Sequence, residues 1–165
     1  MARVAALWHR IPSNFEDQLD ELQGHVTEYQ FDDGYDDVMD VADILDTRRL
    51  TGVFFIVPGW LGLDGQATKE QVAELYHRGH TIGNHTMHHV LMSRVPMAVQ
   101  RAEWEAAQVA LCDIIGEKPD RFAWPYGQEG EVTLGVQPRG IQSFEVFAPR
   151  KLSGWEVHKA VQSLP

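Results

Sequence analysis

One stretch of the sequence decides the fold: Gly52-Val53-Phe54-Phe55-Ile56-Val57, which Pro58-Gly59 brings to an end. A continuous apolar run of this length is typical of a strand that is covered on both faces. Strands of that kind occur in parallel sheets that carry helices. The run therefore predicts an α/β protein in which the other segments alternate between strand and helix.

The flanking sequence shows this alternation. Apolar runs predict further strands at Val4–Trp8, Val26–Phe31, His80–Gly83, Arg121–Trp124 and Ile141–Phe147. Apolar residues at helical spacing predict helices that begin near Asn14, Asp36, Thr68 and Pro96. Thr68 with Gln71 has the pattern of a capping box. Because β-α-β crossovers give parallel strands, the carboxyl ends of these strands should meet at one edge of the sheet, where such folds carry their sites.

Histidines cluster directly after one of the predicted strands. His85, His88 and His89 lie in the segment Gly-Asn-His-Thr-Met-His-His at residues 83–89. On a helical turn His85 and His89 would share one face, and His88 could compete with His89 on spacing alone. Imidazole nitrogens are common metal ligands, and a catalytic site needs a third ligand. Asp32 and Asp33, which follow the strand at 26–31, are the best carboxylate candidates.

Three short motifs together resemble a known family. They are Phe-Asp-Asp-Gly at 31–34, Gly-Asn-His-Thr-x-x-His at 83–89 and Phe-Ala-Trp-Pro-Tyr-Gly at 122–127. Their order and spacing resemble the first three motifs of the polysaccharide deacetylases, the NodB homology domain of carbohydrate esterase family four. The resemblance runs from about Trp8 to about Val157. It implies an irregular (β/α) barrel, and we expect residues 1–165 to form a single, reduced domain of that type.

The resemblance also implies a metal site and a general base. Asp33, His85 and His89 would bind one divalent cation, with zinc as the first choice and cobalt, nickel or manganese as alternatives. Asp32 would be the general base that takes a proton from water as the water attacks an acyl carbon.

Further roles follow from the third motif and from later residues. The backbone N–H of Tyr126, held by Pro125, would stabilise the oxyanion. Many family members carry an arginine where this chain has Ala123, and Arg150 is the candidate to orient Asp32 in its place. The Leu-x-His motif that supplies the general acid in the family is not found, and His158 is the nearest candidate.

Aromatic residues near the predicted strand ends are candidates for sugar contacts. Trp60 follows Pro58-Gly59, and Tyr35 follows the acidic pair. Pro125 completes the predicted substrate-binding set.

Charge and hydropathy exclude several classes of partner. The formal net charge is −10 at pH 7, so the surface repels nucleic acid and anionic lipid. No apolar run reaches the length of a membrane span. Residues 1–7 are too short for a signal peptide, which predicts a cytoplasmic protein as the sequence stands and an exported one if a leader has been removed.

The sequence thus predicts a metal-dependent hydrolase that removes N-acetyl groups from an N-acetylated sugar or glycan. The alternatives are a hydrolase of another small non-peptide amide and a silent member that binds glycan or metal without turnover. The oligomeric state is not predicted.

Overall fold

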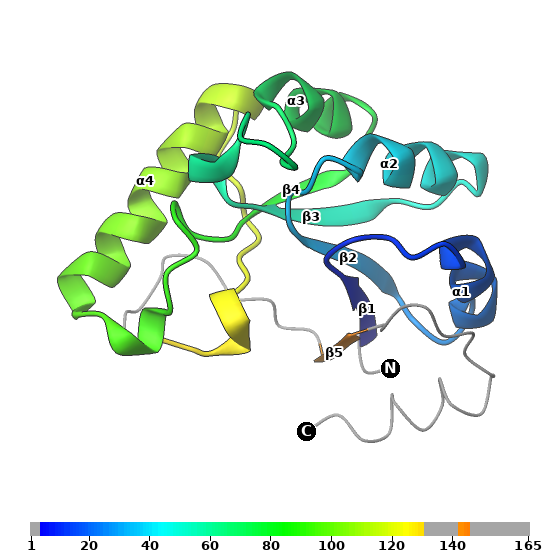
Figure 1. Cartoon of the computed structure of the whole chain (residues 1–165), viewed down its shortest axis with the longest axis horizontal. Helices are drawn as coiled ribbons and strands as arrows, with labels where there is room; N and C mark the ends of the chain where they lie inside the picture. Colours follow the sequence, from blue (N-terminus) through cyan, green and yellow to red (C-terminus); the bar gives the residue numbers. More distant parts are fainter. Residues whose placement is uncertain (1–3, 131–141, 146–165) are drawn as a thin grey trace.

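The structure is a computed structural model, and it describes residues 4–130 and 142–145. These residues form one parallel sheet in the order β4-β3-β2-β1-β5 (Figure 1). The strands are β1 (Val4–Trp8), β2 (Glu28–Asp33), β3 (Gly52–Ile56), β4 (Thr81–Asn84) and β5 (Gln142–Glu145). Every pairing between them is parallel, as the apolar run at 52–57 predicts.

The helices lie in an arc along one face of this sheet (Figure 1). They are α1 (Phe15–Leu22), α2 (Val38–Thr47), α3 (Lys69–His77) and α4 (Met97–Ile115). Short 3-10 turns are η1 (Pro58–Trp60), η2 (Met92–Arg94) and η3 (Pro125–Gly127). The arrangement is α/β and corresponds to part of a (β/α) barrel, as expected. In the described part of the chain, no helix combines the length and the apolar character that crossing a membrane requires.

The capping box predicted at Thr68 and Gln71 forms at the start of α3, whereas the Asn14 side chain makes no capping hydrogen bond to α1. The Thr68 hydroxyl accepts a hydrogen bond from the Gln71 backbone at 3.2 Å, and the Gln71 side chain accepts one from the Thr68 backbone at 2.8 Å. This capping box satisfies two N–H groups that would otherwise lack partners at the start of α3. Gly116, in the left-handed conformation with φ 84°, ends α4.

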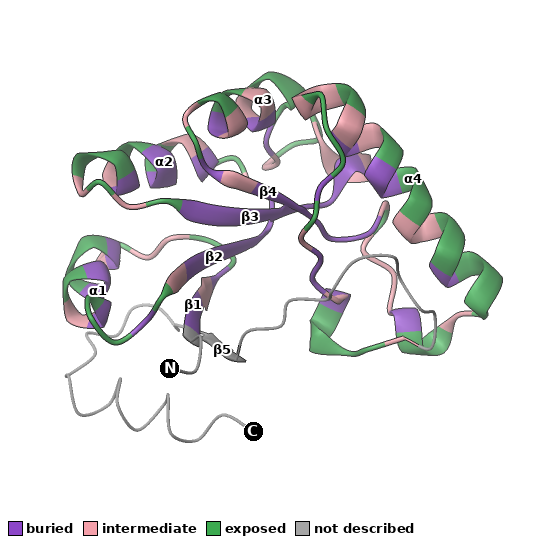
Figure 2. Ribbon diagram, turned by 180° about the vertical axis from the view of Figure 1, so that it is seen from behind, coloured by how far each residue is buried: buried purple, intermediate pink, exposed green. Residues whose placement is uncertain are grey.

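The main core lies between the sheet and the helices. Trp8, Phe31 and Phe54 are cross-strand neighbours on β1, β2 and β3. Their rings stack in a row, with centroids 5.5 Å and 4.9 Å apart. Figure 2 shows β2 and β3 buried along most of their length and the helices exposed on the side away from the sheet. Burial of large aromatic side chains is the main stabilising contribution here.

The opposite face of the sheet carries more polar residues. Val53 and Phe55 form a small second cluster there with Ala123. Arg121 donates to both carboxylate oxygens of Glu28, at 2.7 Å and 3.0 Å. This ion pair connects β2 to the segment that follows α4.

Two predicted strands differ in extent from the structure. The strand predicted at Val26–Phe31 begins at Glu28 and continues through Asp33, so the acidic pair is part of it. The strand predicted at Arg121–Trp124 is only an isolated bridge between Asn84 and Phe122. Pairing stops there because β4 ends at Asn84 and Pro125 has no N–H to continue a ladder.

Candidate metal centre

The acidic pair lies at the carboxyl end of β2. Asp32 and Asp33 are buried, at 6% and 5% exposure. Neighbours on a regular strand point to opposite faces. Asp33, however, has φ 77°, in the left-handed region that aspartate tolerates better than most residues. As a result both carboxylates approach the same nitrogen: Asp33 Oδ1 lies 3.4 Å and Asp32 Oδ2 lies 3.9 Å from His85 Nε2.

The histidine segment is an irregular loop, and not the helical turn considered from its spacing. Thr86 and His89 both have positive φ, at 66° and 56°. The loop nevertheless brings the rings of His85 and His89 together, with centroids 4.8 Å apart. The side chain of His88 is 61% exposed and contacts Glu103 instead. The structure therefore groups His85 and His89 and leaves His88 outside the group.

Asp33, His85 and His89 form a cluster with the geometry of a metal site. One ligand atom from each residue lies within 4.8 Å of the others. Asp33 Oδ1 is 3.2 Å from His89 Nε2 and, among the described residues, is a buried oxygen without a hydrogen-bond partner. One buried carboxylate oxygen and two imidazole nitrogens are a ligand set that suits a divalent cation, such as zinc, and leaves coordination positions open on it.

A backbone carbonyl fixes the orientation of the His85 ring. Its Nδ1 lies 2.9 Å from the backbone oxygen of Ala123. A carbonyl can only accept, so Nδ1 carries the hydrogen and Nε2 presents its lone pair toward Asp33. A contact of this kind orients histidine ligands in metal sites. The sequence does not reveal it, because a backbone carbonyl leaves no signal in residue type.

The electrostatics keep Asp33 ionised. Burial raises the pKa of the Asp33 carboxyl, but the facing imidazoles of His85 and His89 lower it by a larger amount, so the net pKa is well below its usual range. The pKa of Tyr35 is raised by burial and then by Asp33, to which the Tyr35 hydroxyl is hydrogen-bonded. The Arg10 guanidinium lies 4.2 Å above the Tyr35 ring. Tyr35 is therefore next to the cluster and half-buried.

Aromatic rings surround His89. The ring of Trp60, on η1, lies 5.0 Å from that of His89. The ring of Tyr126, on η3, lies 4.6 Å from it. Tyr126 is 64% exposed and has φ 59°, and Pro125 before it is buried. Of the predicted site residues, Arg150 lies outside the described part of the chain, as does His158.

Comparisons with known proteins agree with this arrangement. The family profile described as polysaccharide deacetylase matches residues 20–139. The chain therefore belongs to the polysaccharide deacetylase family. It is 27% identical over 128 residues to the peptidoglycan-N-acetylmuramic acid deacetylase PdaA of Bacillus subtilis, a match that covers 76% of this chain and 43% of PdaA. The chain thus spans less than half the length of this curated relative.

Solved structures share the fold. IcaB from Ammonifex degensii superposes with a TM-score of 0.69 at 23% identity. The Streptococcus pyogenes deacetylase PplD, solved in complex with acetate, superposes with a TM-score of 0.67 at 18% identity. In both cases the match covers 79% of this chain and 76% of the other. At these identities the likeness shows the fold, which is that of the NodB-type deacetylases.

Proposed function

We propose that this protein is a metal-dependent hydrolase that removes N-acetyl groups from an N-acetylated sugar or glycan. The observation that carries the proposal is the convergence of Asp33, His85 and His89 beside a second buried carboxylate, Asp32. Membership of the polysaccharide deacetylase family and the similarity to PdaA support the choice of reaction. In this proposal residues 1–165 act as one catalytic domain.

Asp33, His85 and His89 would hold the cation, with zinc as the first candidate and cobalt, nickel or manganese as alternatives. Such a cation activates water at neutral pH and polarises an acyl oxygen. Asp32 is the proposed general base. Its carboxylate is buried, and its Oδ2 lies 3.9 Å from His85 Nε2, close to the cluster without being part of it.

The same aspartate can complete the reaction. After the water has attacked the acyl carbon, the leaving amine needs a proton. Asp32 holds the proton taken from the water and can return it to that amine. The proposal therefore does not require a separate general acid.

Tyr126 and the aromatic residues would place the acetyl group and the sugar. The backbone N–H of Tyr126, in the turn fixed by Pro125, is the proposed second donor to the oxyanion. Trp60 and Tyr35 are the proposed sugar contacts, and Pro125 adds an apolar surface. Arg150 stays the candidate, from sequence alone, for orienting Asp32.

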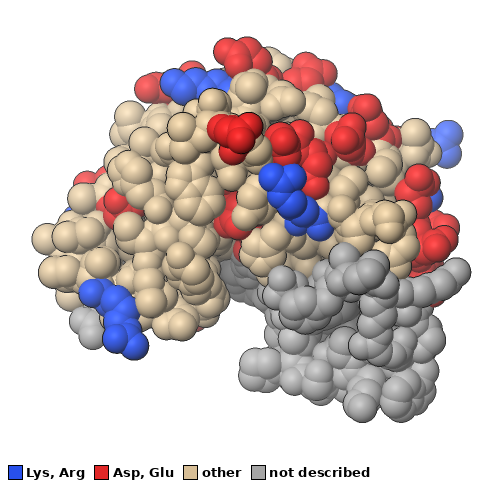
Figure 3. Space-filling model, in the orientation of Figure 1, with Lys and Arg blue, Asp and Glu red and all other residues tan. Residues whose placement is uncertain are grey.

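The charge distribution favours a substrate that is not strongly anionic. The formal net charge is −10. Figure 3 shows acidic side chains spread over the upper part of the visible face, with basic ones fewer among them. A neutral acetylated sugar meets no long-range repulsion from such a surface, whereas nucleic acid does.

Acetate release tests the proposal. The purified protein is stripped of metal, then restored with Zn²⁺, Co²⁺ or Mn²⁺, and acetate is measured from N-acetylglucosamine oligomers and from peptidoglycan fragments. Oligomers represent the small substrates of a cytoplasmic enzyme, and fragments represent the polymer that an exported enzyme meets. Acetate release that requires metal is the expected result. Metal binding without acetate from either set would favour another amide substrate or a silent binder.

A further inference from the structure

We infer that Glu103, on α4, is a positioning residue that holds the loop carrying His89 in the conformation needed to bind metal. This inference rests on the proposed metal site and adds a residue to it. Glu103 is not one of the proposed ligands, which are Asp33, His85 and His89. It acts through the backbone of Met87 and His88, which precede His89 directly.

The loop needs external support because its backbone is strained. Thr86 and His89 have φ of 66° and 56°, in the left-handed region. For residues other than glycine that region costs on the order of 1–3 kcal/mol per residue, and a β-branched threonine is a clear outlier there. Such a conformation persists only where neighbouring contacts fix it.

Contacts from three elements fix the first part of the loop. The Asn84 side chain accepts from the Thr86 N–H at 2.8 Å and donates to the α4 backbone at Trp104 O, 3.1 Å away. The Met87 carbonyl accepts from Gly59 N–H, on η1, at 2.9 Å. The Met87 N–H donates to the backbone oxygen of Glu103 at 3.1 Å. The loop is thus bonded to η1 as well as to α4.

The carboxylate of Glu103 fixes the residue next to His89. Its Oε2 accepts from the His88 N–H at 2.8 Å, and its Oε1 lies 2.9 Å from His88 Nδ1. The Glu103 side chain is only 12% exposed, whereas that of His88 is 61% exposed. Among the described residues, the carboxylate is therefore the anchor of His88 on the α4 side.

Close packing against η1 limits how the loop can respond. A Cβ added at Gly59 would lie 2.4 Å from Met87 O and 2.9 Å from His88 Cδ2. The loop therefore cannot move further toward Gly59. With the Glu103 carboxylate gone, His88 is free to move away from α4, and His89 can relax out of its left-handed conformation. Its Nε2 would then lose its position 3.2 Å from Asp33 Oδ1.

Metal affinity, measured without substrate, tests the inference. Zn²⁺ affinity of the metal-stripped full chain is measured by competition with a chelating dye, and Co²⁺ absorption in the visible region reports ligand geometry. Glu103→Ala should weaken Zn²⁺ binding about tenfold, the lower end of the effect seen for groups that orient metal ligands, and should change the Co²⁺ spectrum. Glu105→Ala, on the exposed side of the same helix, is the matched control and should leave both unchanged.

Two conservative variants distinguish the effect of side-chain length at position 103 from the effect of its negative charge. Glu103→Gln keeps an oxygen at the distance that accepts the His88 N–H, and it should bind Zn²⁺ within about twofold of the wild type. Glu103→Asp keeps the charge but is one methylene shorter, and it should resemble Glu103→Ala. These two variants test the positioning role of Glu103 even if Glu103→Ala does not fold.

The outcomes distinguish the inference from the proposed function. If the wild-type protein binds no metal, the proposed metal site fails and the role of Glu103 fails with it. If the wild type binds metal and Glu103→Asp binds it equally well with the same Co²⁺ spectrum, only the positioning role is overturned. A loss in Glu103→Gln as large as that in Glu103→Asp would also overturn it.

Discussion

His85 and Ala123 are joined by a 2.9 Å contact between the imidazole Nδ1 and the backbone carbonyl oxygen. The segment after α4 thus holds the ring that β4 delivers, and Nε2 of that ring faces the Asp33 carboxylate at 3.4 Å. Many members of the family carry an arginine at the position of Ala123. In this chain residue 123 orients His85 through its backbone carbonyl, and an amino acid of any type would supply that carbonyl.

The first prediction concerns the proposed metal ligands. Single replacement of Asp33, His85 or His89 by alanine should weaken Zn²⁺ binding by more than about 100-fold, because groups that only orient ligands already contribute about 10- to 100-fold. The measurement is Zn²⁺ titration of metal-stripped protein. His88→Ala is the control, since the His88 side chain is 61% exposed and points to Glu103, and it should bind within about threefold of the wild type. A His88→Ala loss equal to that of His89→Ala would contradict this ligand set.

The second prediction concerns the hydroxyl of Tyr35, which is hydrogen-bonded to Asp33. Tyr35→Phe should weaken Zn²⁺ binding about tenfold, because Asp33, a proposed metal ligand, loses a group that orients it. Tyr76→Phe, on α3, serves as the control. If Tyr35 instead contacts only the sugar, Tyr35→Phe will raise KM for acetate release and leave Zn²⁺ affinity unchanged.

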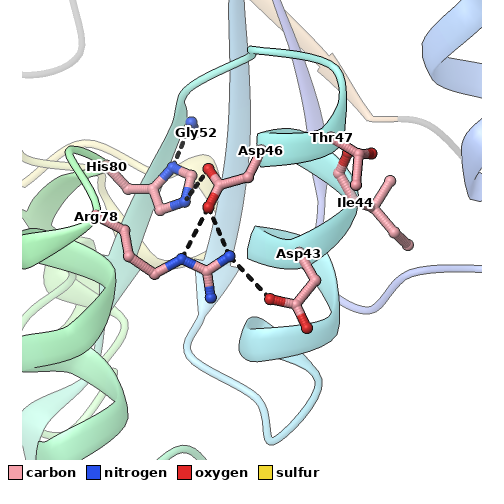
Figure 4. A network of polar contacts seen from close by, with 7 residues as sticks. All are labelled: Asp43, Ile44, Asp46, Thr47, Gly52, Arg78 and His80. Carbon is pink, nitrogen blue, oxygen red and sulfur yellow. Dashed lines mark hydrogen bonds and ion pairs between the residues drawn. The ribbon is translucent and has the colours of Figure 1, made fainter.

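The third prediction concerns pH and a second buried histidine. His80 Nδ1 accepts from the Gly52 N–H at 3.1 Å, and Figure 4 shows its ring between Gly52 and Asp46, with Arg78 close to the same carboxylate. Burial lowers the pKa of His80, although the nearby Asp46 charge opposes this shift. His80 is therefore neutral in the folded protein over a range of pH in which the unfolded chain takes up a proton.

The sign of the effect follows from this difference. Well above pH 6.5, the ordinary pKa of histidine, His80 is neutral in both states. As pH falls through 6.5 toward the lowered folded pKa, the unfolded state gains protons and the free energy of unfolding decreases. Urea unfolding of metal-free protein between pH 7.5 and 5 measures this slope. His80→Gln should have a smaller slope than the wild type, whereas His77→Gln, at the exposed end of α3, should not. Equal slopes for all three proteins would show that His80 does not contribute.

The fourth prediction compares two ion pairs. Arg121 and Glu28 lie on the polar face of the sheet, with side chains 21% and 14% exposed. Arg121→Met should lower the free energy of unfolding by about 2 kcal/mol, because a largely buried carboxylate loses its partner. Arg48→Met breaks the pair with Glu16, which is 61% exposed, and should cost at most about 1 kcal/mol. Urea unfolding measures both, and a larger cost for Arg48→Met would contradict the comparison.

Features encoded locally in the sequence could be predicted from it. The apolar run at 52–57 predicts β3 and the parallel sheet, and the capping box of Thr68 and Gln71 predicts the start of α3. The acidic pair and the histidine segment could be placed together because parallel strands bring their carboxyl ends to one edge. The choice of Asp33 and His89 within those segments came from the family resemblance, since spacing alone left His88 as an alternative.

Features that depend on distant contacts could not be predicted. The left-handed backbone at Asp33 and His89 decides how the carboxylates and imidazoles meet, and neither residue type requires it. The contact of Glu103 with His88 joins residues on separate elements, and a glutamate on an amphipathic helix looks like any solvated charge. The short bridge at Phe122 likewise depends on where β4 ends.

The division of roles between Asp32 and Asp33 is the central claim, and one paired measurement tests it directly. Bound Zn²⁺ and acetate release from N-acetylglucosamine oligomers are measured together for the wild type, Asp32→Asn and Asp33→Asn. The expected result is that Asp32→Asn keeps its Zn²⁺ and loses at least about 100-fold in acetate release, the lower bound for removing a general base, whereas Asp33→Asn loses both. Acetate release by Asp32→Asn at the wild-type rate, with Zn²⁺ bound, would contradict the assignment of Asp32 as the general base.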